Sequence, residues 1–133
     1  MPRIGCVTVL TKGTRLPFSK ETAVRYAEKI LSMVKGKKDH ICILFTDDAG
    51  IRRLNKKYMK RDKNTDVLAF ETGDIAISAE RAAKNSKRFG STIADELKLY
   101  MIHGILHLSG YDDVSSPKRK EMRGMEEEIL ARL

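Results

Sequence analysis

The sequence lacks tryptophan and long apolar runs, and it is poor in aromatic residues. Its 133 residues contain no Trp, and aromatic residues make up 6% of the chain. The platform on which many single-strand binding proteins stack bases is therefore not evident. No apolar run approaches the roughly 20 residues that a membrane-spanning helix needs, and residues 1–4 show no signal-peptide pattern. These absences predict a cytoplasmic protein without a membrane partner.

Cysteine is also scarce. Cys6 and Cys42 stand far apart and form no C-x-x-C pair, which disfavours a redox motif, a disulfide framework and a thiolate zinc site. Two isolated thiols agree with a reducing compartment. The length predicts a single domain over residues 1–133, which can bury a core without a disulfide or a structural metal.

Positive charge is in excess. The chain has 26 Lys and Arg against 18 Asp and Glu, a formal net charge of +8. Basic residues gather in segments 35–38, 56–63 and 118–123. Each segment alone favours a solvated helix face or loop over a binding site. Together with the net charge they favour a nucleic acid as partner and disfavour a small-molecule substrate.

The pattern of apolar residues predicts an α/β fold with a small mixed sheet of about four strands flanked by about five helices. Strands are expected over residues 4–10, 40–45, 65–70 and 74–78, the last two as a hairpin. The first helix is expected from Lys20 to about Lys35, with Ser19 as its cap and Gly36 as its end, and the second begins after Asp47 or Asp48 as cap. Two further helices are expected to begin at about Ala79 and at about Thr92. The last helix is expected to have Ser116 as its cap and Pro117 at its first helical position.

Apolar stripes within two of these helices predict which faces are buried. In the helix after Asp47 or Asp48, Ile51, Leu54 and Tyr58 are expected to face the core. In the last helix the stripe consists of Met122, Met125, Ile129 and Leu133.

Two histidines four residues apart, His103 and His107, followed by Asp113, are the strongest chemical signal. Residues at i and i+4 share a helix face, and Gly110 can end the helix so that the chain folds Asp113 back toward both rings. Three nitrogen and oxygen ligands with a position left for water are typical of a catalytic metal. The alternative is a pair of core histidines bonded to backbone, with Asp113 capping a turn.

The residue after the first histidine narrows the chemistry. In zinc proteases that position is a glutamate, which serves as general base. Here it is Gly104, so a protease is disfavoured.

The motif from His103 to Asp112, H-G-I-L-H-L-S-G-Y-D, resembles the signature H-G-x-L-H-L-x-G-Y-D-H of the endoribonuclease YbeY family, bacterial metal-dependent factors of ribosomal RNA maturation. A second block, formed by residues 54–55, 65–70 and 73–75, is similar to the family's L-N, T-D-V-L-S-F and G-D-I. Met122 and the glutamates after it resemble the family's C-terminal helix. The resemblance covers the chain from about residue 40 onward.

Three positions depart from the family pattern. Asp113 stands where the family has its third metal histidine, Ala69 where it has a serine, and Met59 where it usually has an arginine. The resemblance then implies His103, His107 and Asp113 as ligands of one divalent transition metal. Two imidazoles and a carboxylate suit zinc, iron(II) or manganese, and zinc is expected. Arg61, two residues after Met59, is expected to replace the lost arginine.

The resemblance implies a metal-dependent endoribonuclease that cuts single-stranded RNA in ribosomal RNA maturation and ribosome quality control, with the small ribosomal subunit as partner. Lys60, Arg61 and Lys63 are expected to bind RNA. Arg61, Asp66 and Glu96 are the catalytic candidates, although Asp66 can equally cap a turn or strand end and Glu96 can stabilise the first turn of its helix.

Two rival functions remain open. One is a ribosome-assembly factor that binds RNA or ribosomal proteins and whose metal site is vestigial or structural. The other is a hydrolase of a small phosphorylated or amide substrate.

Overall fold

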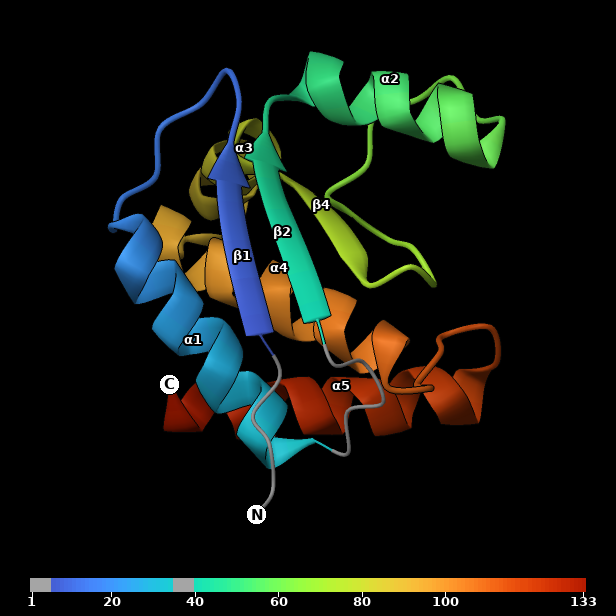
Figure 1. Cartoon of the computed structure of the whole chain (residues 1–133). Coiled ribbons are helices and arrows are strands. Elements are labelled where there is room, and N and C mark those ends of the chain that lie inside the picture. The colour runs from blue at the N-terminus through green and yellow to red at the C-terminus, as the bar shows by residue number, and fades with distance from the viewer. Residues whose placement is uncertain (1–5, 35–39) are drawn as a thin grey trace.

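The computed structural model describes residues 6–34 and 40–133, and in them strands and helices follow one another as a mixed α/β chain (Figure 1). The elements are β1 (Cys6–Thr11), α1 (Lys20–Met33), β2 (His40–Thr46), α2 (Asp48–Met59), β3 (Val67–Ala69), β4 (Asp74–Ser78), α3 (Ala79–Phe89), α4 (Ile93–Leu108) and α5 (Ser116–Arg132). Ile4 and Gly36, which were expected to begin a strand and to end a helix, lie outside the described residues. None of the helices in the described ranges is long and apolar enough to cross a membrane.

The four strands form one sheet in the order β1-β2-β4-β3. β1, β2 and β4 run parallel, and β3 pairs antiparallel with β4 as the predicted hairpin. Along β2, Ile41, Ile43 and Phe45 are at most 1% exposed and pack in the main core with α1 and α4. Cys42 and Leu44, which alternate with them, face the opposite side of the sheet.

α4 is the central helix of the fold. Its side chains at Leu97, Met101 and Ile105 are fully buried, and it contacts β3, β4, α1, α3 and α5. Gly104 allows the close approach of α4 to the sheet, because a Cβ there would lie 2.8 Å from Cγ2 of Ile75. The glycine of the histidine motif therefore sets the position of His103 beside it.

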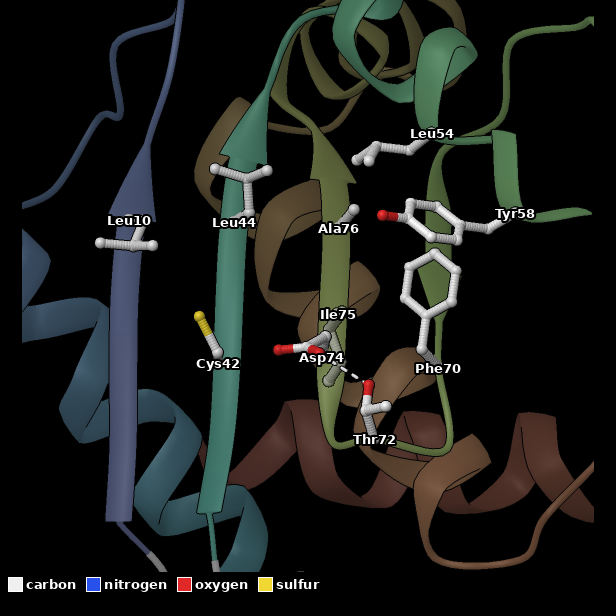
Figure 2. Close-up of a pocket in the computed structure, with 10 residues that line it drawn as sticks. All are labelled: Leu10, Cys42, Leu44, Leu54, Tyr58, Phe70, Thr72, Asp74, Ile75 and Ala76. Carbon is white, nitrogen blue, oxygen red and sulfur yellow. Dashed lines mark hydrogen bonds between the residues drawn. The ribbon is translucent and has the colours of Figure 1, made fainter. Parts of the chain in front are cut away.

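The other face of the sheet is covered only in part. α2 packs over β3 and β4 through Ile51 and Leu54, which contact Leu68 and Ala76. Beside α2, on the face of the sheet where the Leu44 side chain lies, is an open pocket of about 420 Å³ (Figure 2). No helix formed by residues 6–34 and 40–133 covers this part of the sheet (Figure 1).

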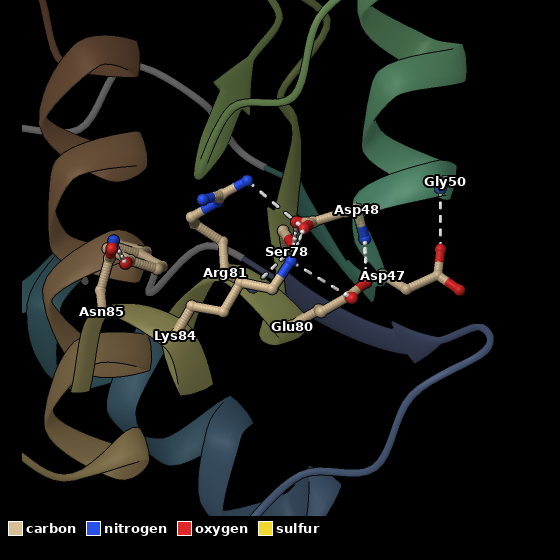
Figure 3. A network of polar contacts seen from close by, with 9 residues as sticks. Asp47, Asp48, Gly50, Ser78, Glu80, Arg81, Lys84 and Asn85 are labelled. Carbon is tan, nitrogen blue, oxygen red and sulfur yellow. Dashed lines mark hydrogen bonds and ion pairs between the residues drawn. The ribbon is translucent and has the colours of Figure 1, made fainter. Parts of the chain in front are cut away.

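A buried carboxylate joins α2 to α3. Asp48 accepts hydrogen bonds from Ser78 Oγ at 2.7 Å and from Lys84 Nζ at 2.9 Å, and Arg81 lies 3.4 Å away (Figure 3). The Glu80 carboxylate accepts the backbone N–H of Asp48 at 3.0 Å. Burial alone would raise the pKa of Asp48, but these donors and cations hold it below its ordinary value.

Most of the predicted helix starts are confirmed. Ser19, Asp47 and Thr92 each accept a backbone N–H of the first turn. The predicted cap of α5, Ser116, is wrong by one residue, because Ser115 is the side chain that accepts the N–H of Lys118.

Two further expectations are corrected. Strand β3 covers Val67–Ala69 and is shorter than residues 65–70, although one backbone hydrogen bond at each end, Ser78 to Asp66 and Phe70 to Asp74, continues the pairing with β4. Tyr58 does not face the core. It is 55% exposed and packs edge-on against Phe70 at the rim of the open pocket.

Candidate metal centre

His103 and His107 face each other across one turn of α4. Their Nε2 atoms lie 3.1 Å apart. Two nitrogens bound to one tetrahedral zinc at 2.0–2.1 Å are separated by about 3.3 Å. The spacing of the two Nε2 atoms therefore fits a shared cation without a change in the backbone of α4.

Asp113 joins the pair through the turn that ends α4. Gly110 has a left-handed φ of +102°, and the N–H of Tyr111 donates back to the carbonyl of Leu106 at 3.0 Å. One ligand atom each from His103, His107 and Asp113 lies within 4.8 Å of the others. The carboxylate of Asp113 is exposed and can close the remaining gap by side-chain rotation. The structure thus brings the three predicted ligands together.

Glu126 on α5 was not among the predicted site residues. Its Oε2 lies 2.5 Å from Nδ1 of His103, and the His103 and Glu126 side chains are 27% and 15% exposed. A carboxylate that accepts Nδ1–H leaves the lone pair of Nε2 directed at the cation position, as in many metal sites with histidine ligands. One signal was available: Glu126 stands four residues after the buried Met122, on the apolar stripe of α5.

The pKa values of the two histidines are shifted in opposite directions. Burial opposes protonation of His103, but the charges of Glu126, Asp66 and Asp113 outweigh it and raise the pKa of His103 above its usual value. Burial, together with the nearby His103, lowers the pKa of His107. His107 is therefore neutral near pH 7, which is the form that binds metal.

The two carboxylates proposed as general base differ in position. Asp66 is partly buried and lies close enough to His103 for its charge to raise the pKa of that histidine. Glu96 lies seven residues before His103, which is about 10 Å along the helix. It is 8% exposed and accepts a hydrogen bond from Ser91 Oγ at 2.9 Å. Of the two, Asp66 is the one whose charge acts on His103.

The three predicted RNA-binding residues follow α2. Lys60 adopts a left-handed φ of +58° and ends the helix, and Arg61 donates its N–H to the carbonyl of Asn55. Asn55 also donates to the carbonyl of Lys63 at 3.0 Å. The side chains of Lys60, Arg61 and Lys63 are exposed, and none forms an ion pair within the described ranges. The segment has a fixed backbone and free cations, but these cations do not contact the histidines.

A buried tyrosine lies one turn before His103. Tyr100 is 4% exposed, and its hydroxyl accepts a hydrogen bond from Asn85 Nδ2 at 2.6 Å. Burial raises the pKa of Tyr100 to about 12, although the bond from Asn85 acts in the opposite direction. The phenol stays protonated at neutral pH and does not serve there as a proton acceptor.

Comparison with known proteins gives a consistent result. The family model described as Endoribonuclease YbeY matches residues 10–133. The curated Endoribonuclease YbeY of Aquifex aeolicus is 34% identical, covering 94% of this chain and 91% of that protein. The one of Enterococcus faecalis is 31% identical, covering 93% and 94%. A Thermotoga maritima protein with a known solution structure superposes with a TM-score of 0.68 at 28% identity, covering 93% of this chain and 86% of that one. The chain belongs to the endoribonuclease YbeY family, as its histidine motif implied.

Proposed function

We propose that this protein is a metal-dependent endoribonuclease that hydrolyses single-stranded RNA in the maturation and quality control of ribosomal RNA in the cytoplasm. Membership of the endoribonuclease YbeY family supports the activity. The single structural observation that carries the metal dependence is the approach of His103 Nε2 and His107 Nε2 to 3.1 Å, with Asp113 beside them.

The ligand set suits one divalent transition metal, with zinc as the preferred ion. When bound, such an ion polarises a phosphoryl oxygen and makes a bound water more acidic. His103, His107 and Asp113 would hold it. Glu126 orients the His103 ring by accepting its Nδ1–H. The negative charge of Asp113 partly neutralises the ion, so we expect the bound water to be less acidic than with three imidazoles.

The remaining roles fall to residues around this centre. Lys60, Arg61 and Lys63 would bind the phosphates, because they are exposed and form no ion pair with another described residue. Arg61 would stabilise the charge that develops on the scissile phosphate. Asp66 is the proposed proton acceptor, since among the carboxylates whose charges act on His103 it is the one that neither belongs to the ligand set nor bonds to the His103 ring. Glu96, which is bonded to Ser91, would stabilise the start of α4 instead.

A cleavage assay with a matched binding assay tests the proposal. The wild type with zinc, manganese or iron(II) should cut single-stranded RNA. His107→Ala should bind that RNA nearly as well but cut it at least about tenfold more slowly, because His107 holds the metal and contributes little to the charge that attracts phosphate. His40→Ala is the matched control, since His40 is an exposed histidine at the start of β2 and lies outside the site.

A second candidate function is favoured by the departures from the family motif. Met59, which replaces an arginine, is 40% exposed and offers no charge to a phosphate. If RNA stays intact with all three metals while binding persists, the nuclease proposal is wrong and a ribosome-assembly factor takes its place. Cosedimentation with the small ribosomal subunit would then identify the partner.

A further inference from the structure

The open pocket beside α2 is distinct from the metal centre and has the composition of a small-ligand site. The sheet forms its floor through Cys42, Leu44 and Ala76, and α2 forms one wall through Leu54 and Tyr58 (Figure 2). Its volume of about 420 Å³ lies within the range of roughly 300–1,000 Å³ that is usual for such sites. It is large enough for one flat heterocycle with part of its sugar.

The pocket presents an aromatic ring to solvent. Tyr58 is 55% exposed, and Phe70 supports its ring edge-on with the centroids 5.6 Å apart. Lys57 Nζ lies 5.2 Å from the centroid of the same ring. An aromatic ring that is supported at its edge and about half exposed is suited to stacking on a base, and the lysine adds positive charge next to it.

One carboxylate, that of Asp74, lies at the end of the pocket opposite Tyr58. Asp74 Oδ2 accepts the hydroxyl of Thr72 at 2.6 Å, whereas Oδ1 accepts no hydrogen bond within residues 6–34 and 40–133. Figure 2 shows this carboxylate directed over the floor toward Cys42. Burial and the charge of Asp74 raise the pKa of the Cys42 thiol, so that group is neutral. An acceptor at this place favours a ring that donates N–H groups.

Positive charge lies outside the pocket, in segment 56–63, which includes Tyr58 and continues beyond it. Lys56, Lys60, Arg61 and Lys63 are exposed there, while the one acid among them, Asp62, is paired with Arg52 at 2.7 Å. A nucleotide has the complementary distribution, with a neutral, donor-bearing ring and an anionic phosphate. An apolar protein segment would leave both Asp74 and the lysines without partners.

We propose that this pocket binds one unpaired base of single-stranded RNA, with Tyr58 stacked on the base and Asp74 accepting its N–H groups, and that guanine is preferred. Guanine presents N1–H and the 2-amino group side by side, which matches the two oxygens of a carboxylate. In Asp74, Oδ1 is free of hydrogen bonds from other described residues and can accept one of these groups, and Oδ2 keeps a second lone pair for the other beside its bond from Thr72. Uracil presents one N–H, and adenine and cytosine present one amino group. The inference rests on the proposed function, because it takes RNA as the substrate.

Binding of labelled RNA hexamers by fluorescence anisotropy tests the inference, with EDTA present to prevent cleavage. The hexamers are uridines with guanine, inosine or uracil at one central position; inosine lacks only the 2-amino group of guanine. The wild type should bind the guanine hexamer about tenfold more tightly than the other two. Asp74→Asn should reduce this preference to less than about twofold.

Substitutions at Tyr58 test the stacking. Tyr58→Leu should weaken the binding of all three hexamers about tenfold, since stacking of one base on an aromatic ring raises affinity roughly 5- to 150-fold. Tyr58→Phe keeps the ring and should bind like the wild type. Lys60→Gln is a contrasting variant, because it should reduce the salt dependence and leave the base preference unchanged.

The outcomes separate this inference from the proposed function. If the wild type cuts RNA while Tyr58→Leu and Asp74→Asn keep its affinity and base preference, the pocket does not bind a base, and a protein segment becomes the alternative occupant. If the wild type neither binds nor cuts RNA, the proposed function fails and the inference fails with it.

Discussion

Glu126 should set the metal affinity of the site without touching the metal. It lies 2.5 Å from Nδ1 of His103, in a pair whose side chains are at most 27% exposed, so solvent screens the interaction only in part. Loss of such a carboxylate from a ligating histidine usually lowers metal affinity 10- to 100-fold, which is about 1.4–2.8 kcal/mol. We expect Glu126→Ala to lie near the upper figure. Glu126→Gln should lie near the lower one, because its amide oxygen can still accept Nδ1–H.

Competition with a chromophoric chelator measures this effect directly. Zinc affinity is determined for the wild type, both Glu126 variants and Glu127→Ala, which removes the exposed neighbouring carboxylate. Glu127→Ala should match the wild type, which excludes a general effect of charge on α5. Equal zinc affinity of Glu126→Ala and the wild type, within about twofold, would refute the role given to Glu126.

Three further predictions concern packing, pH and substrate. Gly104→Ala should lower the free energy of unfolding by about 1–3 kcal/mol in urea titrations, because the new Cβ would lie 2.8 Å from Ile75. Asp48→Asn should lower the free energy of unfolding by about 1–2 kcal/mol at pH 7, a modest loss because part of the ion-pair network around Asp48 is exposed to solvent. Because the folded-state pKa of Asp48 is lowered, the contribution of its ionised carboxylate to stability is complete above the ordinary pKa of 3.8 and is lost as the pH falls from there through the folded-state pKa. Asp48→Asn should therefore lose less stability than the wild type on acidification. Arg61→Ala should slow RNA cleavage on the order of a hundredfold, and an unchanged rate would show that Arg61 does not replace the arginine missing at position 59.

Local patterns in the sequence were sufficient for most of the fold. Helix starts could be read because capping is a contact between residues three apart, as at Ser19 and Thr92. The same rule could not choose between Ser115 and Ser116, since both stand before Pro117 and differ only in which one keeps an extended backbone. The metal triad was also readable, because its members lie within eleven residues of one another on a helix end and the following turn.

Features that depend on tertiary packing could not be read in this way. Glu126 is 23 residues from His103, and it reaches the ring only because α5 packs against α4. Helical spacing placed Tyr58 with Ile51 and Leu54, but no helix in the described part of the chain covers the sheet beyond α2, so the ring stays exposed. The pocket beneath it joins residues from β1, β2, β4, the turn between β3 and β4, and α2, and its shape follows from the strand order.

Titration of metal into chelator-treated protein tests the central claim most directly. With single-stranded RNA as substrate, we expect cleavage to rise with added zinc, manganese or iron(II) and to level off at about one equivalent per chain, as one three-ligand site requires. His103→Ala and His107→Ala should show no such rise. Full cleavage by the wild type in the presence of excess chelator would contradict a metal-dependent mechanism at His103, His107 and Asp113.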